Sequence, residues 1–327
     1  GSEMCIRDSL KSGRPLEAIH AGTMENSYPQ QKKSVDELAA YLAYALRILK
    51  NCDLPCEGIT TPGGFGNAVK AELSLAVDEA VRDVYGVEIP HYFKYVNLGD
   101  KSTEPVLEQL RGVGTDDVRF TVNVPAGTGD WFGGWQGDSL SEGDRYCNRE
   151  ATAGRMVELI ERRQPALLLC HWPGMYSNGT KEGFLTFQRI VRSLESRFAD
   201  QTIWMKLSEI GRYWAAKQLT RLSRREDRIT LDAVVATTDF TLRVERCPGS
   251  MEIGSGQGWR TLRNVASPAA LEPGTFTRRG DAAIVCFDLP KGNTELRVTA
   301  CRRATTIFDL LLVAQESGFP LHCAGHR

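Results

Sequence analysis

The sequence predicts an α/β protein with a parallel sheet, followed by a small antiparallel β domain. In the first two thirds of the chain, short apolar runs alternate with amphipathic helical segments, which is typical of parallel strands joined by crossover helices. After about residue 223, β-like runs follow one another between Pro and Gly turns, with no helix between them. We therefore expect two regions, 10–222 and 223–300, connected through LSRRED (222–227).

The helices are marked by apolar residues at spacings of three and four. The first is predicted over 34–51, where Ser34 and Glu37 form a capping box at its start. A second covers about 67–85 and ends at Gly86. Further helices are predicted over GRMVELIERR (154–163), EGFLTFQRIVRSLESRF (182–198) and SEIGRYWAAKQL (208–219).

The strands of the parallel sheet are predicted from short apolar runs between these helices. They are LEAIH (16–20), the start of CEGITTPGGFG (56–66), VRFTVNV (118–124), ALLLC (166–170) and TIWMKL (202–207). Ligands of parallel α/β folds bind at the carboxyl ends of the strands. The residues that follow these runs are therefore the candidate site.

The overall composition excludes several classes of partner. With 40 basic and 41 acidic residues the formal net charge is −1, which gives no electrostatic reason to expect nucleic acid or an anionic membrane. No apolar run approaches the length of a membrane span, about 20 residues. The nine cysteines are odd in number and scattered, which favours reduced thiols and a cytoplasmic location. Neither a G-x-S-x-G nor an H-E-x-x-H motif occurs.

Both ends of the chain differ in character from the rest. GSEMCIRDS (1–9) lacks the apolar region of a signal peptide and resembles the adapter-like string at the ends of translated metagenomic reads. We interpret it as non-native, so that the true N-terminus is missing. The segment 301–327 breaks from the preceding composition and is a candidate for a non-native tail.

Two histidines follow predicted strands. His20 ends LEAIH and His171 ends LLLCH. Histidine is the commonest metal ligand and titrates near neutral pH, so these are candidate ligands or general acids and bases, with Glu25 as a nearby oxygen ligand. A histidine at a strand end that only bonds a backbone group is the alternative for each, and a surface carboxylate is the alternative for Glu25.

The segment GDWFGGWQGD combines aromatic rings, glycines and the carboxylates of Asp130 and Asp138. Flat rings bind the apolar faces of sugars, while carboxylates accept protons from sugar hydroxyls. A packed loop whose tryptophans belong to the core is the alternative. The predicted substrate-binding residues are Trp131, Phe132 and Trp135 of this segment, Pro62 and Phe65 of the TPGGFG turn, and Trp172 and Asn178 after His171.

Taken in order, these features resemble the polysaccharide deacetylase (NodB-homology, carbohydrate esterase family 4-like) superfamily over about residues 15–215. HAGTMEN, with His20, stands where the family has a paired-histidine motif. TTPGGFG stands for its proline–aromatic–glycine loop, DW (130–131) for its Asp-Trp motif, and LLLCHW for its catalytic histidine. The chain departs from the family where the second metal histidine falls on Met24 or Asn26, and the aspartate-bearing first motif is absent.

The resemblance implies a distorted (β/α) barrel, incomplete at the N-terminus, and a carbohydrate-active hydrolase that removes N- or O-acetyl groups from a glycan. It implies a divalent, zinc-like metal with an incomplete ligand set, of which His20 and Glu25 are the candidates. Metal-bound water would attack the acetyl carbonyl, His171 would protonate the leaving group, and Asp130 is the second catalytic candidate.

Two alternatives remain open at the level of sequence. One is a metal-independent glycan-active enzyme that uses carboxylates such as Asp130, Asp138 or Glu25. The other is a catalytically inactive carbohydrate-binding protein that keeps the aromatic segment. In each case the expected partner is a glycan or oligosaccharide, and the sequence does not give the oligomeric state.

Overall fold

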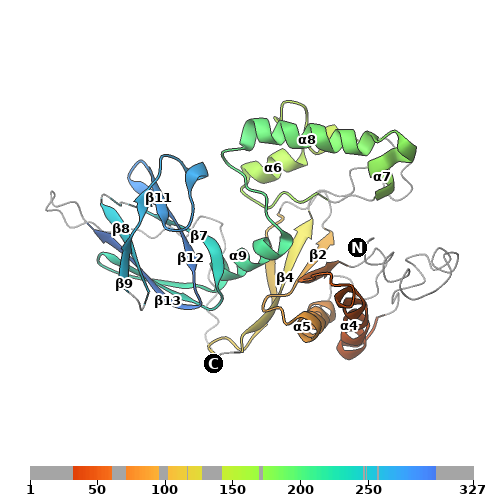
Figure 1. The fold of residues 1–327 in the computed structure, drawn as a ribbon, viewed down its shortest axis with the longest axis horizontal. Helices are drawn as coiled ribbons and strands as arrows, with labels where there is room; N and C mark the ends of the chain where they lie inside the picture. The colour runs from red at the N-terminus through yellow and green to blue at the C-terminus, as the bar shows by residue number, and fades with distance from the viewer. Residues whose placement is uncertain are drawn as a thin grey trace, which may run out of the picture. The chain divides into compact units, whose positions relative to one another are not determined.

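The computed structural model describes residues 32–60, 71–95, 102–115, 117–126, 142–168, 172–245, 247, 249–255 and 258–299. The chain divides into two compact units, Gly1–Ala215 and Ala216–Arg327, which we describe one at a time (Figure 1).

The first unit combines one sheet with several helices. In chain order its elements are α4 (Val35–Lys50), β1 (Gly58–Thr60), α5 (Ala71–Tyr85), β2 (His91–Tyr95), β3 (Val106–Arg111), β4 (Arg119–Ala126), η1 (Gly143–Arg145), α6 (Arg155–Glu161), α7 (Trp172–Tyr176), η2 (Ser177–Gly179), α8 (Glu182–Phe198) and most of α9 (Leu207–Leu219).

The sheet of the first unit has the strand order β1-β2-β4-β3. β1, β2 and β4 are parallel, whereas β3 pairs with β4 in the antiparallel sense at one edge. A short turn joins β3 to β4, and Gly112 (φ +69°) and Gly114 (φ +88°) supply its left-handed backbone. The predicted (β/α) barrel is therefore wrong: the described strands of this unit form an open, mixed sheet, because a hairpin rather than a crossover helix connects its last two strands.

Two predicted strands are also wrong. Residues 166–168 and 202–206 have no strand partner among the described residues. Ala166 and Leu168 pack instead against the helical core formed around α6 and α8. In the second run, Ile203 and Trp204 are 76 % and 68 % exposed. Apolar content alone does not reveal whether a neighbouring strand exists to complete the backbone hydrogen bonds.

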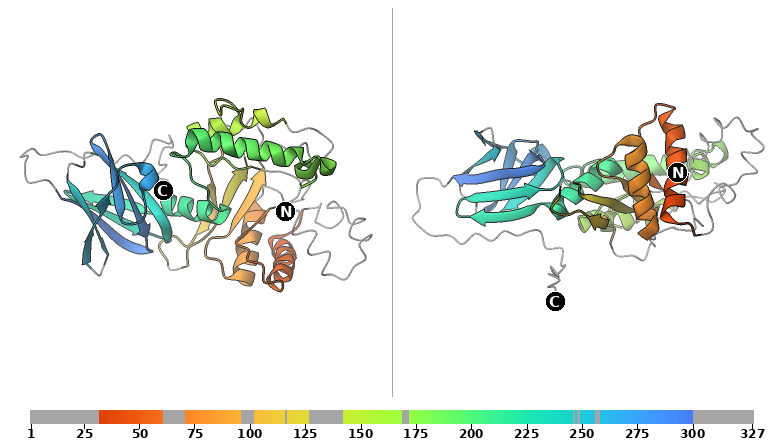
Figure 2. Two further views of the ribbon diagram at one scale, coloured as in Figure 1. Left: turned by 45° about the horizontal axis from the view of Figure 1, so that its top comes forward. Right: turned by 90° about the horizontal axis from the view of Figure 1, so that it is seen from below.

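α4 and α5 form a helical layer against the sheet (Figure 2). The predicted capping box is confirmed: the Glu37 backbone N–H donates to Ser34 Oγ at 3.3 Å, and the Ser34 N–H donates to Glu37 Oε2 at 2.9 Å. Side chains at helical spacing on both helices, including Leu38, Leu46 and Leu73, are fully buried between the helices and the sheet. This layer is the larger apolar core of the unit.

A second core lies between η1, α6 and α8, where Tyr146, Met156 and Ile190 are buried. The chain from η1 to α6 is compact because Asn148 accepts, through its side-chain oxygen, from the backbone N–H of Thr152 and of Ala153. Gly154 has φ +114°, and a Cβ there would lie 2.5 Å from the Tyr146 backbone. Only glycine fits this position without moving the backbone.

The second unit is built from strands. After the end of α9 its described elements are β5 (Arg221–Arg225), β6 (Arg228–Ala233), β7 (Thr237–Val244), β8 (Ser250–Ser255), β9 (Gly258–Thr261), β10 (Arg263–Asn264), η3 (Pro268–Ala270), β11 (Thr275–Arg279), β12 (Ala282–Leu289) and β13 (Gly292–Thr299).

These strands form two sheets with the orders β10-β11-β12-β7 and β5-β6-β13-β8-β9. All neighbours are antiparallel except β10 and β11. Alternate side chains are buried along strands such as β6, with Ile229 and Leu231, and β7, with Leu242 and Val244. Phe287 meets Phe240 edge-to-face, with ring centroids 5.7 Å apart.

Two findings concern the described part of the chain as a whole. None of its helices has the length and apolar character required to cross a bilayer. Its cysteines, Cys52, Cys56, Cys147, Cys247 and Cys286, are all free thiols.

Candidate functional site

The carboxyl ends of β1, β2 and β4 meet at one edge of the sheet. In the register of the three parallel strands, Thr60 lies beside Phe93, Phe93 beside Val124, and Tyr95 beside Ala126. The described parts of the three strands end at this edge, at residues 60, 95 and 126. In an open parallel sheet this is the edge at which ligands bind.

Pro62 and Phe65 follow β1 in sequence and Asp130 follows β4, but most of the predicted site residues lie outside the described residues. This holds for the metal candidates His20 and Glu25, the catalytic candidates Asp130 and His171, and the binding candidates Pro62, Phe65, Trp131, Phe132 and Trp135. Trp172 begins α7 and Asn178 is part of η2, but their side chains also lie outside the description. The prediction that these residues converge stays a prediction.

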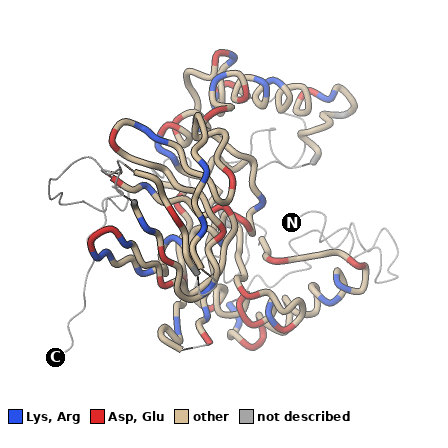
Figure 3. The backbone as a smooth tube through the Cα atoms, turned by 60° about the vertical axis from the view of Figure 1, so that its left-hand side comes forward, with Lys and Arg blue, Asp and Glu red and all other residues tan. Residues whose placement is uncertain are grey.

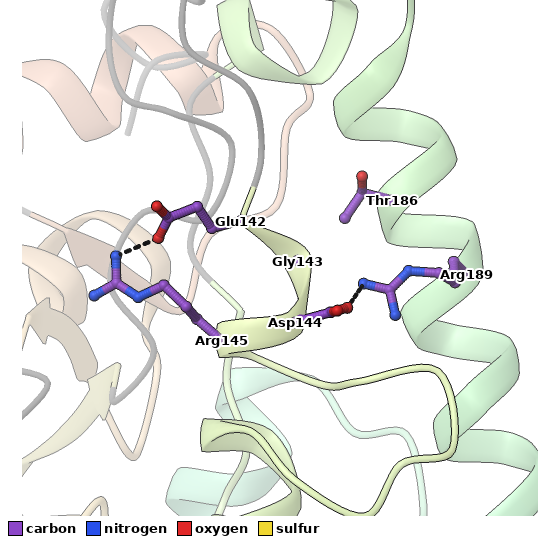
Figure 4. A pocket seen from close by; sticks show the side chains of 6 residues that line it. All are labelled: Glu142, Gly143, Asp144, Arg145, Thr186 and Arg189. Carbon is purple, nitrogen blue, oxygen red and sulfur yellow. Dashed lines mark hydrogen bonds and ion pairs between the residues drawn. The ribbon is translucent and has the colours of Figure 1, made fainter.

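A polar pocket lies between the turn at residues 142–145 and helix α8 (Figure 4). Its volume is about 370 Å³, and η1 and α8 supply its walls. One ion pair joins η1 to α8, with Arg189 Nη2 2.8 Å from Asp144 Oδ1, and a second lies within the η1 turn, with Arg145 Nη1 2.9 Å from Glu142 Oε2. The pocket thus presents carboxylates that accept hydrogen bonds and guanidinium groups that donate them.

The pocket keeps its shape because η1 approaches α8 closely. A Cβ at Gly143 would lie 2.5 Å from Arg189 Nη2 and 2.5 Å from Thr186 Cγ2, so glycine is needed there. Arg189 also donates through Nη1 to the Cys147 carbonyl at 3.0 Å. This second bond fixes the guanidinium group on the loop that follows η1, so that its charge faces the pocket.

A second pocket of about 300 Å³ shares Arg145 with the first and is also lined by Tyr146, Arg155 and Glu158. Arg155 is only 8 % exposed and donates through Nη1 to Glu158 Oε2 at 2.9 Å. This hydrogen bond is the main reason that the pKa of Glu158 lies below its ordinary value. Charged groups of both signs therefore line both pockets.

A half-buried polar network joins side chains of three strands of the sheet, and the sequence pattern did not predict it. Tyr92 donates to Glu108 Oε2 at 2.6 Å, and Asn123 Nδ2 lies 3.2 Å from Glu108 Oε1. Burial, together with the hydrogen bond to Glu108, raises the pKa of Tyr92. The sequence places Asn123 on a predicted strand, but it does not show which strands lie beside it. Tyr92 and Glu108 reach Asn123 because β2 and β3 are the two neighbours of β4 in the sheet.

His91 is the histidine whose surroundings the structure describes. It is the first residue of β2, and is therefore at the opposite end of the strand from the candidate site. It is 8 % exposed, and its Nδ1 is buried without a hydrogen-bond partner in the described part of the chain. Burial lowers its pKa from 6.5 to about 4. We assign it a packing role beneath α9, where Gly211 approaches its Cβ.

The predicted metal site is neither supported nor opposed by the structure. Within the described ranges, no three His, Cys, Asp or Glu side chains are grouped so that they could hold a metal ion. The candidate ligands His20 and Glu25 fall outside these ranges. The zinc-like metal remains an expectation that comes from the resemblance alone.

Comparisons with known proteins were made for sequence and for fold. No family model matches the chain, and no curated protein matches it. A crystal structure described as an alpha-L-fucosidase from Bacteroides thetaiotaomicron aligns with 82 % of this chain at 11 % sequence identity and a TM-score of 0.29. The chain spans 66 % of that structure, just under two thirds of its length. A likeness this small carries no argument about the fold or the activity of this chain.

Proposed function

We propose that this chain is a carbohydrate-active hydrolase that binds a glycan at the carboxyl edge of β1, β2 and β4. The observation that carries the proposal is the parallel register of these strands. Because of it, the segments TPGGFG and GTGDWFGGWQGD start from the same edge of one sheet. Rings such as Trp131 would contact the apolar face of a sugar there, and Asp130 would accept its hydroxyl protons.

The described pocket supports a polyhydroxylated ligand. Its first lining residue, Glu142, is four positions after the end of the aromatic segment at Asp138, and its volume of about 370 Å³ lies at the small end of the range for ligand sites. Sugar hydroxyls both donate and accept hydrogen bonds, which matches a wall of alternating carboxylates and guanidinium groups. An apolar ligand would displace water from these charged groups and offer no hydrogen bond in return.

Removal of an acetyl group is the reaction we propose for this site. The proposal draws on the resemblance of the DW and LLLCHW segments to the deacetylase motifs, and it does not require a closed barrel, which the described strands do not form. In this reaction His171 protonates the leaving oxygen or nitrogen as the acetyl carbon is attacked by water. Asp130 is the candidate base.

Glycan binding without turnover is the second candidate. One observation favours it at the described pocket: both lining carboxylates, Glu142 and Asp144, already form ion pairs with arginines. Carboxylates held in this way can still accept hydrogen bonds from sugar hydroxyls through their remaining lone pairs.

Acetate release and binding to acetylated glycans test the two candidates together. The purified chain should release acetate from acetylated xylan or from acetylated chitooligosaccharides, with and without added zinc. His171→Ala should lower turnover by about 10²–10⁴-fold while binding persists, since a positioned proton donor contributes about that much. Trp131→Ala should instead weaken binding about tenfold, the loss expected for one aromatic contact.

Trp204→Ala is the matched control, because Trp204 is 68 % exposed and lies on none of the described pockets. It should change neither turnover nor binding. Binding that depends on Trp131 without any acetate release would favour the second candidate. A chain that neither binds a glycan nor releases acetate would refute both.

A further inference from the structure

The second unit carries an exposed aromatic side chain on the outer face of its five-stranded sheet. Along the strands of this sheet, Leu231, Met251 and Leu296 point inward and are fully buried. The side chains between them point outward, and the sheet therefore presents one polar face. Trp259 of the edge strand β9 is the large aromatic residue of this face, and it is 37 % exposed.

The ring of Trp259 lies against Gly254 of the neighbouring strand. It lies opposite Gly254 in the register of β8 and β9, and a Cβ at Gly254 would meet the indole ring at 3.1 Å. The guanidinium carbons of Arg297 and Arg228 lie 4.3 and 5.5 Å from the ring centroid. The glycine makes room for the ring, and the two arginines restrict its orientation, so that the ring is preorganised.

Charged side chains of both signs surround the ring. Arg297 donates through Nε to Glu252 Oε2 at 2.8 Å, and Arg228 Nη1 lies 3.4 Å from Glu295 Oε2. These four side chains come from β6, β8 and β13, and each remains partly exposed. Basic and acidic positions both occur on the strands of this unit (Figure 3). Within these two ion pairs the charges balance, and Arg225, opposite Arg228 on β5, adds a positive charge at the edge of the sheet.

We propose that this face, centred on Trp259, is a second glycan-binding surface that takes an uncharged polysaccharide. A preorganised ring beside paired donors and acceptors complements a sugar, which has an apolar C–H face and hydroxyls at its edge. The inference rests on the proposed function for the class of ligand, but it concerns a different surface. Its role is to hold a polymer, not to carry out the reaction.

Affinity electrophoresis of the full chain provides the test. Native gels would contain hydroxyethyl cellulose, galactomannan or acetylated xylan, with polygalacturonate and poly(dT) as charged counter-probes. At least one neutral polysaccharide should retard the chain, and Trp259→Ala should weaken that binding about tenfold. Trp259→Tyr, which keeps a ring over Gly254, should retain most of the retardation, and Trp204→Ala should retain all of it.

Acetate release from a small soluble substrate separates this inference from the proposed function. Trp259→Ala should leave that turnover unchanged, because the variant alters only the polymer-binding face. Equal retardation of Trp259→Ala and wild type, each folded by circular dichroism, would overturn the inference while leaving the proposed function standing. Retardation by polygalacturonate or poly(dT) alone, or by no polysaccharide, would also overturn it. If Trp259→Ala does not fold, Trp259→Tyr is compared with Trp259→Leu. Retardation that persists in the Tyr variant and is lost in the Leu variant would show that binding needs an aromatic ring, and equal retardation of the two would overturn the inference.

Discussion

At the scale of single residues, the burial of His91 is explained by the space that its side chain fills. The imidazole of His91 fills the volume beside Gly58 on the neighbouring strand, and a Cβ at position 58 would collide with it. Burial without a partner at Nδ1 disfavours the charged form. His91 is therefore neutral in the folded chain well below the pH at which free histidine is protonated.

This burial predicts a loss of stability in mild acid. The folded state binds the His91 proton only near pH 4, whereas the unfolded state binds it near pH 6.5. Between these pH values the unfolded state binds more protons than the folded state. The contribution of His91 to the free energy of unfolding is therefore fully present above pH 6.5 and is lost as the pH falls toward 4, with a total loss of about 3 kcal/mol at most. Urea unfolding at a series of pH values should show this fall, and His91→Gln should flatten it. An unchanged pH profile in that variant would argue against the assignment.

At the scale of elements, one carboxylate connects a helix to the sheet. Asp78 on α5 has a fully buried side chain that accepts from Arg82 on the same helix and from Arg111 at the end of β3. Thr121 of β4 donates to the Ser74 carbonyl of α5 at 2.7 Å. The helix is thus held on the sheet by polar contacts as well as by its apolar stripe.

Asp78→Ala should destabilise the chain by about 3 kcal/mol, because it leaves two arginines without their shared buried partner. Asp83→Ala is the control on the same helix. Asp83 is 62 % exposed and pairs with Arg47 at 2.6 Å, so its loss should cost less than about 1 kcal/mol. Guanidinium unfolding of both variants measures the difference, and equal losses would show that the buried triad adds nothing to stability.

At the scale of the whole molecule, the two compact units each contain their own buried residues. In the second unit, Leu231 is fully buried and lies opposite Leu222, which is 36 % exposed. Units with separate cores commonly unfold in separate transitions.

We therefore expect calorimetry to show two unfolding transitions. Leu231→Ala should lower one of them, with a cost of about 2–5 kcal/mol from the cavity it leaves, and should not shift the other. Leu222→Ala, the matched exposed leucine, should shift neither by more than a fraction of that amount. One transition that moves as a whole in Leu231→Ala would show that the units unfold together.

The sequence by itself determined the elements whose signal is local. The capping box at Ser34, the helices with apolar residues at spacings of three and four, and the strand predicted over 118–124 and found at 119–126 are confirmed, since each depends on residues within a few positions of one another. The alternation expected for that strand is wrong, because Phe120, Thr121 and Val122 are buried in succession. It also determined which residues are candidates for chemistry, although the predicted site residues lie outside the described part of the chain. For these, the structure adds the common edge from which two of their segments start.

Only the tertiary structure decided how the strands combine. HYFKY was not predicted as a strand, yet β2 lies between β1 and β4 and brings their ends to one edge. The apolar run at 202–206, predicted as a strand, finds no partner among the described residues and stays exposed. Backbone hydrogen bonds between strands join residues far apart in the chain, so a run of suitable residues becomes a strand only where a neighbour completes those bonds. The open sheet in place of a barrel follows from the same cause.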